Sequence, residues 1–475
     1  MPDSTVPDKD VALTRLLAEW LPQQRWFPGR GIALSDIVIV SDVLLLAGDP
    51  AMRHLIVQAP LASGTIARFQ VPVGYRTELP PNLSGALIGY QDGQACYDAL
   101  HDPELAEVLL SGMSEGRHVG PLRFIREHDA PDFAGFPGGR VLGVEQSNTS
   151  LVFGDQAMLK VLRRLFPGPN PDLEVADALA RLGSGRVAAP YGWIETDLDG
   201  EPVLLAVLSR FLAGAREGWT LALEHLQQLY RRQDTPSRDQ LTAPVAVGAV
   251  RVDGHPPADG LPFTQEARQL GRTTAELHAD MARAFGNRAM TGAELAGLAA
   301  DMNAKLTEAL AVVPELAGYE ARIRSAYDAV ARLPGPVTVQ RIHGDYHLGQ
   351  VLLGPDGWVA LDFEGEPAVP LAVRRAPAPA LRDVAGMLRS FDYAARQQLV
   401  GHPAAAPLAP LADAWARQCQ AAFCAGYAEG GGVDPDGHGA LLHALTLEKA
   451  VYEVVYESRH RPAWLSIPLD FVAAA

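Results

Sequence analysis

The stretch that decides the fold is Gln340–Pro367, with the sequence QRIHGDYHLGQVLLGPDGWVALDFEGEP. Its apolar runs at 351–353 and 359–363 contain β-branched residues and lie on either side of a GPDG turn. Short runs of this kind around turn residues predict a β-hairpin. Gln350 and Asp362 flank that turn, so a hairpin would bring their side chains close together.

The polar residues of this stretch are those that phosphoryl transfer requires. One carboxylate must orient the acceptor hydroxyl and take its proton, while an amide oxygen and a second carboxylate hold Mg²⁺ on the donor phosphates. We expect Asp345 to fill the first role and Gln350 and Asp362 the second, with Glu364 reaching a second metal ion or the acceptor. The alternative is two acidic turns at the surface, because Asp is common in turns.

The spacing of these residues is similar to that of the kinase catalytic loop, His-x-Asp-x4-Asn followed by Asp-Phe-Gly. Here His343, Asp345 and Gln350 are followed by Asp362-Phe363-Glu364-Gly365. Gln stands where Asn is usual, and a Glu is inserted before the Gly. The form HGD-x-H-x-G is that of aminoglycoside and choline kinases rather than protein kinases. His343 is expected to support the loop from behind.

Length, charge and cysteine content narrow the class of protein. A chain of 475 residues is expected to form two or three units. The net charge of −16 argues against nucleic acid and anionic membranes as partners. Three cysteines give no disulfide framework and suit a reducing cytosol. We see no signal peptide and no apolar run long enough to span a membrane, so a cytoplasmic protein is expected.

The first hundred residues predict a small α+β unit. A helix is expected at 11–21, strands at 36–46, 53–60 and 66–75, and a helix at 95–112. Trp26 and Arg30 would form either a packed corner or a docking surface.

The next segment has the features of a nucleotide site. Two consecutive hairpins are expected at 140–162, and the polar tip QSNTS lies where a kinase carries its phosphate-covering loop. Lys160 lies among apolar residues in the third strand, so it needs a partner. Glu174, in the first turn of the next helix, would pair with it; the alternative is a lysine extending from an edge strand. The nucleotide candidates are Lys160, Glu174, the tip residues Ser147, Asn148, Thr149 and Ser150, and the expected hinge residues Arg210, Phe211 and Leu212.

Helices dominate after residue 263, following an expected loop insertion at 232–262. The last long helix, 438–459, has aromatic and acidic residues side by side. Such a surface suits a sugar, although an aromatic packing stripe is an equal alternative. Asp383, at the start of an earlier helix, would brace the catalytic loop. The acceptor candidates are Asp345, His347, Tyr452, Glu453, Tyr456 and Arg461.

Five motifs together resemble the actinobacterial maltokinases, which are maltose 1-kinases of the aminoglycoside phosphotransferase and protein-kinase-like superfamily. The motifs are QQRWFPGR, EQSNTSLVFGD with Lys160, HGDYHLGQVL…LDFEGEP, RRAPAPALRDVAGMLRSFDYAA and EKAVYEVVYESRHRPAWLSIPL. The resemblance implies an α+β, bilobal, protein-kinase-like fold. It would comprise an N-terminal cap (1–105), an ATP-binding subdomain (106–212) and a mostly helical lobe (213–475).

The same resemblance implies an activity. ATP with Mg²⁺ would phosphorylate the anomeric hydroxyl of maltose, and the maltose 1-phosphate would feed glycogen-type α-glucan synthesis that starts from trehalose. Trehalose synthase is the implied partner. A second hypothesis is a glucosamine, other amino-sugar or aminoglycoside kinase, since Glu364 and Glu366 leave an acidic pocket open. A third is a non-catalytic sugar or nucleotide sensor, which the presence of Lys160, Asp345 and Asp362 argues against.

Overall fold

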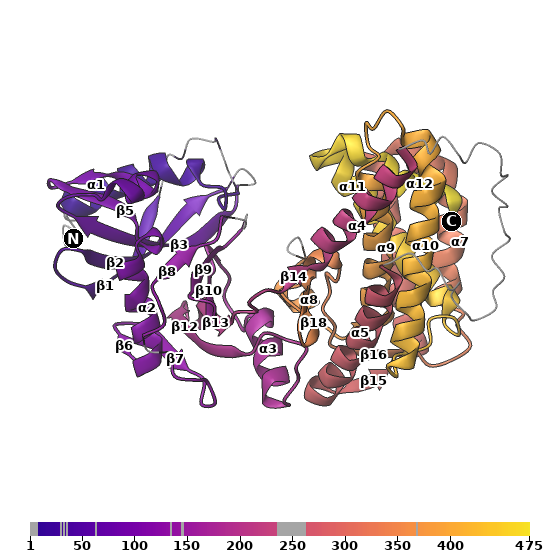
Figure 1. Ribbon diagram of the computed structural model, residues 1–475, viewed down its shortest axis with the longest axis horizontal. Coiled ribbons are helices and arrows are strands. Elements are labelled where there is room, and N and C mark those ends of the chain that lie inside the picture. Colours follow the sequence, from indigo (N-terminus) through magenta and orange to yellow (C-terminus); the bar gives the residue numbers. More distant parts are fainter. Residues whose placement is uncertain are drawn as a thin grey trace. The chain divides into compact units, whose positions relative to one another are not determined.

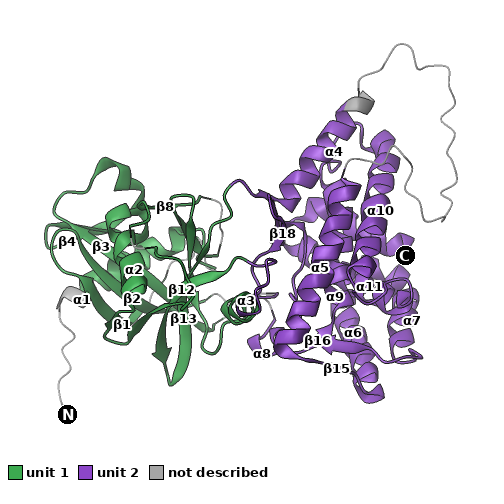
Figure 2. Cartoon of the chain, turned by 60° about the horizontal axis from the view of Figure 1, so that its bottom comes forward, with its two compact units in different colours: residues 1–180, 188–213 green, residues 181–187, 214–475 purple. Residues whose placement is uncertain are grey.

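The computed structural model describes residues 8–28, 31, 34, 37–61, 64–133, 135–143, 147–234, 263–366 and 369–475. The chain forms two compact units, shown in different colours in Figure 2. The first contains residues 1–180 and 188–213, and the second contains residues 181–187 and 214–475. The N-terminal tail up to residue 7, Arg30, and residues 235–262 of the expected insertion lie outside the described residues.

An antiparallel sheet with the strand order β1-β2-β3-β5-β4 forms the N-terminal part of the first unit (Figure 1). Leu13 and Leu17 of helix α1 and the rings of Trp26 and Phe27 are buried with apolar residues of this sheet. Trp26 is therefore part of the core, as a packed corner requires. The elements are α1 (Asp8–Trp20), β1 (Val38–Leu46), β2 (Ala51–Pro60), β3 (Ile66–Arg76), β4 (Leu87–Gln91), β5 (Gln94–Asp98) and α2 (Pro103–Glu115).

The prediction of a helix at 95–112 is wrong for the first half of that range. Strand β5 occupies Gln94–Asp98, and helix α2 begins only at Pro103. The side chain of Asp102 accepts a hydrogen bond from the backbone of Glu104 and so caps α2. Strand β5 lies between β3 and β4 and is buried along most of its length. It therefore lacks the apolar and polar alternation by which a half-buried strand is recognised.

A second, seven-stranded sheet of the first unit has the order β6-β7-β12-β13-β10-β9-β8. The first strand of the two hairpins expected at 140–162 is the short β8, and residues 144–146 after it lie outside the described part. The elements are β6 (His118–Val119), β7 (Leu122–Arg126), β8 (Gly139–Val141), β9 (Thr149–Phe153), β10 (Ala157–Val161), β11 (Arg164–Leu165), α3 (Pro171–Arg181), β12 (Pro190–Leu198) and β13 (Glu201–Arg210).

The two sheets of the first unit share a hydrophobic core. One buried cluster combines residues of β1 and β2, helix α2, and strands β7, β9, β10, β12 and β13. Strand β11, which follows β10 in the chain, pairs with β3 and so belongs to the N-terminal sheet. Arg163, fully buried between them, binds the carboxylate of Asp98 and lies with its guanidinium carbon 4.9 Å from the ring centroid of Trp26. Its Nε donates to Thr149 Oγ1 at 2.8 Å.

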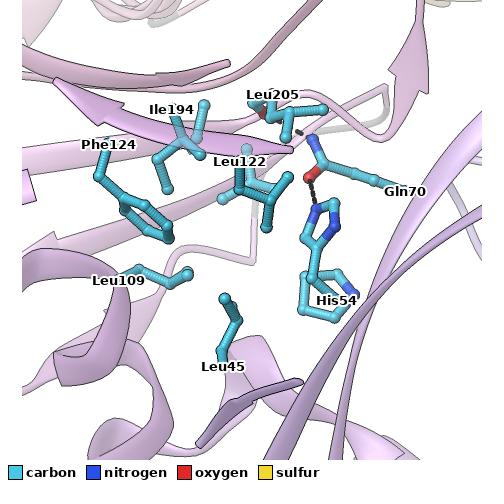
Figure 3. A pocket seen from close by; sticks show the side chains of 11 residues that line it. Leu45, His54, Gln70, Leu109, Leu122, Phe124, Ile194 and Leu205 are labelled. Atoms are coloured by element: carbon cyan, nitrogen blue, oxygen red, sulfur yellow. Dashed lines mark hydrogen bonds between the residues drawn. The ribbon is translucent and has the colours of Figure 1, made fainter. Parts of the chain in front are cut away.

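A small apolar cavity lies within this shared core (Figure 3). At one side of the cavity, His54 Nε2 and Gln70 Oε1 are hydrogen-bonded at 2.8 Å. The amide nitrogen of Gln70 donates to the carbonyl oxygens of Leu162 and Leu205, at 2.6 and 2.5 Å. Gln70, on β3, thus satisfies backbone carbonyl groups of β13 and of the segment after β10.

The second unit is mostly helical, with α5, α9, α10 and α11 packed side by side (Figure 1). The helices are α4 (Gly218–Asp234), α5 (Thr264–Phe285), α6 (Gly292–Val312), α7 (Glu320–Val330), α8 (Leu371–Arg374), α9 (Leu381–Gln397), α10 (Ala405–Glu429), α11 (Gly439–His460) and α12 (Ser466–Ala474). Two small sheets combine β14 (Arg216–Glu217), β17 (Val351–Gly354) and β18 (Gly357–Ala360), and β15 (Asn287–Ala289), β16 (Thr338–Gln340) and β19 (Ala378–Pro379). Among the described helices, none combines the length and apolar character needed to cross a membrane.

Candidate active site

The hairpin expected at the centre of the sequence is formed by β17 and β18. The two strands pair from Val351 with Ala360 to Gly354 with Gly357. The amide nitrogen of Gln350 lies 3.3 Å from Asp362 Oδ2, at the open end of the hairpin. An amide and a carboxylate side by side offer the hard oxygen ligands that Mg²⁺ prefers, so this pair fits that ion.

Asp362 has a backbone conformation that is rare for residues with a side chain. Its φ of 62° is in the left-handed region, which costs roughly 1–2 kcal/mol outside glycine. Strain of this kind is maintained only where the surroundings fix it. His343 is one such neighbour, because its Nε2 lies 2.8 Å from the carbonyl oxygen of Leu361 and its ring packs 5.0 Å from that of Phe363.

Helix α9 holds the loop that contains Asp345. Asp383 accepts hydrogen bonds from the backbone amides of His343 and Gly344, at 2.8 and 2.9 Å. Ser390 Oγ accepts one from the amide of Leu348 at 3.0 Å. Between them, a Cβ on Gly386 would lie 2.6 Å from the carbonyl oxygen of Tyr346, so only glycine allows this approach. Positions 383, 386 and 390 share one helix face, which therefore determines the shape of the loop.

Asp383 is itself fixed from the opposite side. His278 on α5 places Nε2 3.0 Å from Asp383 Oδ2 and Nδ1 2.9 Å from the hydroxyl of Tyr427. Burial acts to raise the pKa of Asp383, but the hydrogen bond and charge of His278 and the amide of Gly344 outweigh it, so the pKa is lowered. Asp383 is thus an ionised brace with several donors.

The side chain of Asp345 lies beside residues of helix α11. Lys449 Nζ is 3.3 Å from Asp345 Oδ1 and 3.5 Å from an oxygen of Glu366. The hydroxyl of Tyr452 donates to Glu366 at 2.6 Å. The ring of Tyr452 stacks on that of Tyr456, with centroids 6.2 Å apart, and both rings are partly exposed. An aromatic surface therefore adjoins the expected proton acceptor.

The other acceptor candidates have different surroundings. Glu453 is buried and accepts from Arg389 at 2.8 Å, and Arg461 pairs with Glu457 and lies over the rings of Tyr456 and Trp464. His347 accepts the amide hydrogen of Gly349 through Nδ1 at 3.0 Å. Burial lowers the pKa of His347, so its ring is neutral at neutral pH.

Lys160 lies in the first unit, on strand β10. This strand runs between β9 and β13, so the edge-strand alternative is wrong. Lys160 Nζ is 3.1 Å from Asp172 Oδ2, and Asp172 and Glu174 both belong to the first turn of α3. The helix expected to supply an acidic partner therefore does so through Asp172, and the pairing of Lys160 with Glu174 stays a prediction.

The hairpin tip before β9 divides into two parts. Ser147 is exposed and Asn148 partly exposed, whereas Thr149 and Ser150 are buried. Ser150 pairs with Lys160 across the sheet, and Thr149 binds Arg163. The first part can reach a ligand, and the second anchors the tip.

The expected hinge follows strand β13. The amides of Arg210 and Phe211 donate to the carbonyl oxygens of Ala189 and Gln156, both at 2.9 Å. A purine that bonds to this segment therefore has to use other backbone groups, such as those of Leu212.

All nucleotide candidates thus belong to the first unit, and all catalytic, metal and acceptor candidates to the second. The sequence did not predict the roles of Gly386, Ser390 and Lys449 at the loop. It also did not predict the contact of Glu366 with Tyr452. The spacing of Asp383, Gly386 and Ser390 on one helix face was an available signal. Lys449 had none, because it meets Asp345 across 104 positions of the chain.

Known proteins resemble this chain along most of its length. Residues 20–102 match the maltokinase N-terminal cap domain, and residues 171–365 match the phosphotransferase enzyme family. A glucosamine kinase of Streptacidiphilus jiangxiensis is 32% identical over 342 residues, which are 70% of this chain and 72% of that protein. A glucosamine kinase of Mycolicibacterium smegmatis is 29% identical over 341 residues, or 70% and 78% of the two chains.

A solved structure has the same fold. A glucosamine kinase in complex with glucosamine, ADP and inorganic phosphate aligns over 97% of this chain and 98% of its own, with 26% identity and a TM-score of 0.65. The α+β, kinase-like fold expected from the sequence is confirmed, and the protein is a phosphotransferase of the kinase type. More particularly, the chain belongs to the same family as the glucosamine kinase of Streptacidiphilus jiangxiensis.

Proposed function

We propose that this protein transfers the γ-phosphate of ATP to a hydroxyl group of a sugar, and that the sugar is maltose, phosphorylated at its anomeric hydroxyl. The observation that carries the proposal is the position of Asp345. It lies on a loop held by three residues of α9, beside Lys449 and the aromatic surface of Tyr452 and Tyr456.

In this mechanism Asp345 accepts a hydrogen bond from the acceptor hydroxyl and takes its proton as the oxygen attacks phosphorus. The bracing by Asp383 and Ser390 keeps the carboxylate in place, so little reorganisation is needed during the reaction. Gln350 and Asp362 would hold Mg²⁺, which neutralises charge on the donor phosphates. Lys160, aligned by acidic residues of α3, would bind the phosphates of ATP.

Two observations favour maltose as the acceptor, and a third suits a sugar of any kind. The five sequence motifs resemble maltokinases, and residues 20–102 match the maltokinase cap. The stacked rings of Tyr452 and Tyr456 are 36% and 40% exposed, and sugar rings pack well on such surfaces. On this proposal the product enters α-glucan synthesis in the cytoplasm, with trehalose synthase as the partner enzyme.

Glucosamine is the second candidate acceptor. The relatives and the solved structure named above are glucosamine kinases. The carboxylates of Asp345 and Glu366 give the site an acidic character that suits an amino sugar.

An acceptor panel tests the proposal. Purified protein with ATP and Mg²⁺ is supplied with maltose, glucose, glucosamine or an aminoglycoside, and ADP release and product NMR are recorded. We expect phosphate on C1 of maltose. Phosphate on another carbon of maltose would contradict the anomeric assignment, and a product formed from another sugar would replace maltose as the acceptor. If no sugar stimulated ADP release, the result would favour a non-catalytic sensor.

The role of Asp345 has its own variant. Asp345→Asn should lower turnover about 10²- to 10⁴-fold, because general-base catalysis has that size, with little change in melting temperature. Asp301→Asn, at an exposed position of α6, is the matched control and should keep full activity. Normal turnover in Asp345→Asn would show that Asp345 does not take the proton of the acceptor hydroxyl.

A further inference from the structure

Asp345 and three neighbouring side chains form one bonded cluster. Lys449 Nζ lies between Asp345 and Glu366, at 3.3 and 3.5 Å from their carboxylate oxygens. The hydroxyl of Tyr452 donates to Glu366, and the Lys449 ammonium is 5.0 Å from the centre of the Tyr452 ring. About a quarter of the Lys449 side chain is exposed, so the cluster is accessible from solvent.

Lys449 carries a positive charge in this setting. Burial acts to lower the pKa of Lys449, but the carboxylates of Asp345, Glu366 and Glu453 outweigh burial and raise it. The site that receives the acceptor therefore already contains a cation.

The neighbouring carboxylates on α11 are engaged elsewhere. Glu448 binds Lys305 and Arg382, and Glu453 binds Arg389. Among the described residues, Asp345 and Glu366 are thus the two carboxylates that Lys449 Nζ contacts directly, and Glu366 also binds the hydroxyl of Tyr452. A cationic acceptor would have to compete with Lys449 for them.

We propose that Lys449 is a specificity-determining residue that makes the acceptor site select neutral sugars over amino sugars. A neutral sugar can accept a hydrogen bond from the Lys449 ammonium while its hydroxyl binds Asp345. The ammonium group of an amino sugar cannot accept that hydrogen bond, and it is repelled by the lysine at close range. This inference rests on the proposed function, since it takes the acceptor to be a sugar bound at Asp345.

Glucose and glucosamine form the matched pair for the test, because they differ only in a hydroxyl or an ammonium at one carbon. The value of kcat/KM is measured for both sugars and for maltose in the wild type, Lys449→Met and Lys449→Arg. We expect Lys449→Met to raise the ratio of glucosamine to glucose at least tenfold and Lys449→Arg to keep the wild-type ratio. Lys305→Met, which removes a lysine that binds Glu448 instead, should leave the ratio unchanged.

The wild type gives a second test that needs no variant. The amino group of glucosamine should titrate near the pKa of an α-amino group, about 8. Raising the pH from 7 to 9 should therefore increase the glucosamine-to-glucose ratio, because the repelled charge is lost.

A glucosamine-to-glucose ratio that Lys449→Met leaves unchanged would overturn the inference alone. If kcat fell equally for both sugars in that variant, Lys449 would act on the transferred phosphoryl group instead. A wild type that prefers glucosamine also contradicts it, while leaving sugar kinase activity intact. A protein that phosphorylates no sugar removes the proposed function and this inference with it.

Discussion

Asp383 shows how a single carboxylate determines the shape of the catalytic loop. It accepts from His278 and from two consecutive loop amides. In Asp383→Asn one acceptor oxygen becomes an NH₂ group that faces a donor, and the loop amides lose an ionised partner. We expect a loss of about 3 kcal/mol in the free energy of unfolding, and a fall in turnover of about 10- to 100-fold from misplacement of Asp345. Urea denaturation and steady-state kinetics measure both.

Asp470→Asn, at an exposed position on α12, is the control for that experiment and should change neither quantity. Equal turnover in Asp383→Asn and the wild type would show that the loop keeps its shape without this brace.

His54 gives the first unit a dependence on pH. Burial lowers the pKa of His54 from its ordinary value of 6.5, so the unfolded chain binds the proton more readily than the folded one. Stability should therefore rise with pH through about 6.5 and fall on acidification. His54→Gln keeps a donor for Gln70 and removes the titration, so its melting temperature should depend less on pH between 5 and 8 than that of the wild type.

His101 is exposed, and His101→Gln should retain the full wild-type dependence on pH. A wild-type melting temperature that is higher at pH 5 than at pH 7 would contradict the assignment for His54.

Arg163 acts at the scale of the elements, because it connects the N-terminal sheet to the strand that begins at Thr149. In Arg163→Met the carboxylate of Asp98 stays buried without its cation, which costs about 3–5 kcal/mol. Thr149 also loses its donor at the base of the hairpin tip. We expect a lower stability and a KM for ATP that rises more than the KM for the sugar. Equal changes in both KM values would argue against a link between the N-terminal sheet and the nucleotide.

Arg164→Met is the matched control, since the neighbouring side chain packs on Phe166 and is partly exposed. It should alter stability by much less than Arg163→Met.

The elements also show which features a sequence can predict. The hairpin of β17 and β18 was predictable because its turn residues and β-branched runs are local. Strand β5 was not, since it is buried between two neighbours and shows no alternation. The contact of Lys449 with Asp345 depends on the packing of α11 against α9, which no local pattern encodes.

At the scale of the whole molecule, the unit boundaries follow the cores. The two sheets of the first unit share one buried cluster, so the N-terminal sheet is not a separate body. In the second unit, the rings of Phe391, Trp415 and Phe423 pack between α9 and α10. Composition and length alone indicated two or three units, because they do not reveal that a core is shared.

Two units with their own cores should unfold in two steps. We expect two calorimetric transitions, of which Arg163→Met lowers one and Asp383→Asn the other, by about 2–4 °C for each kcal/mol lost. Maltose at about a hundred times its Kd should raise the transition that Asp383→Asn lowers, because a ligand stabilises the unit that binds it by about 2.7 kcal/mol at that concentration. A single transition that both variants lower equally would instead mean that the two cores unfold cooperatively, and that the loop around Asp345 depends on the first unit for its stability.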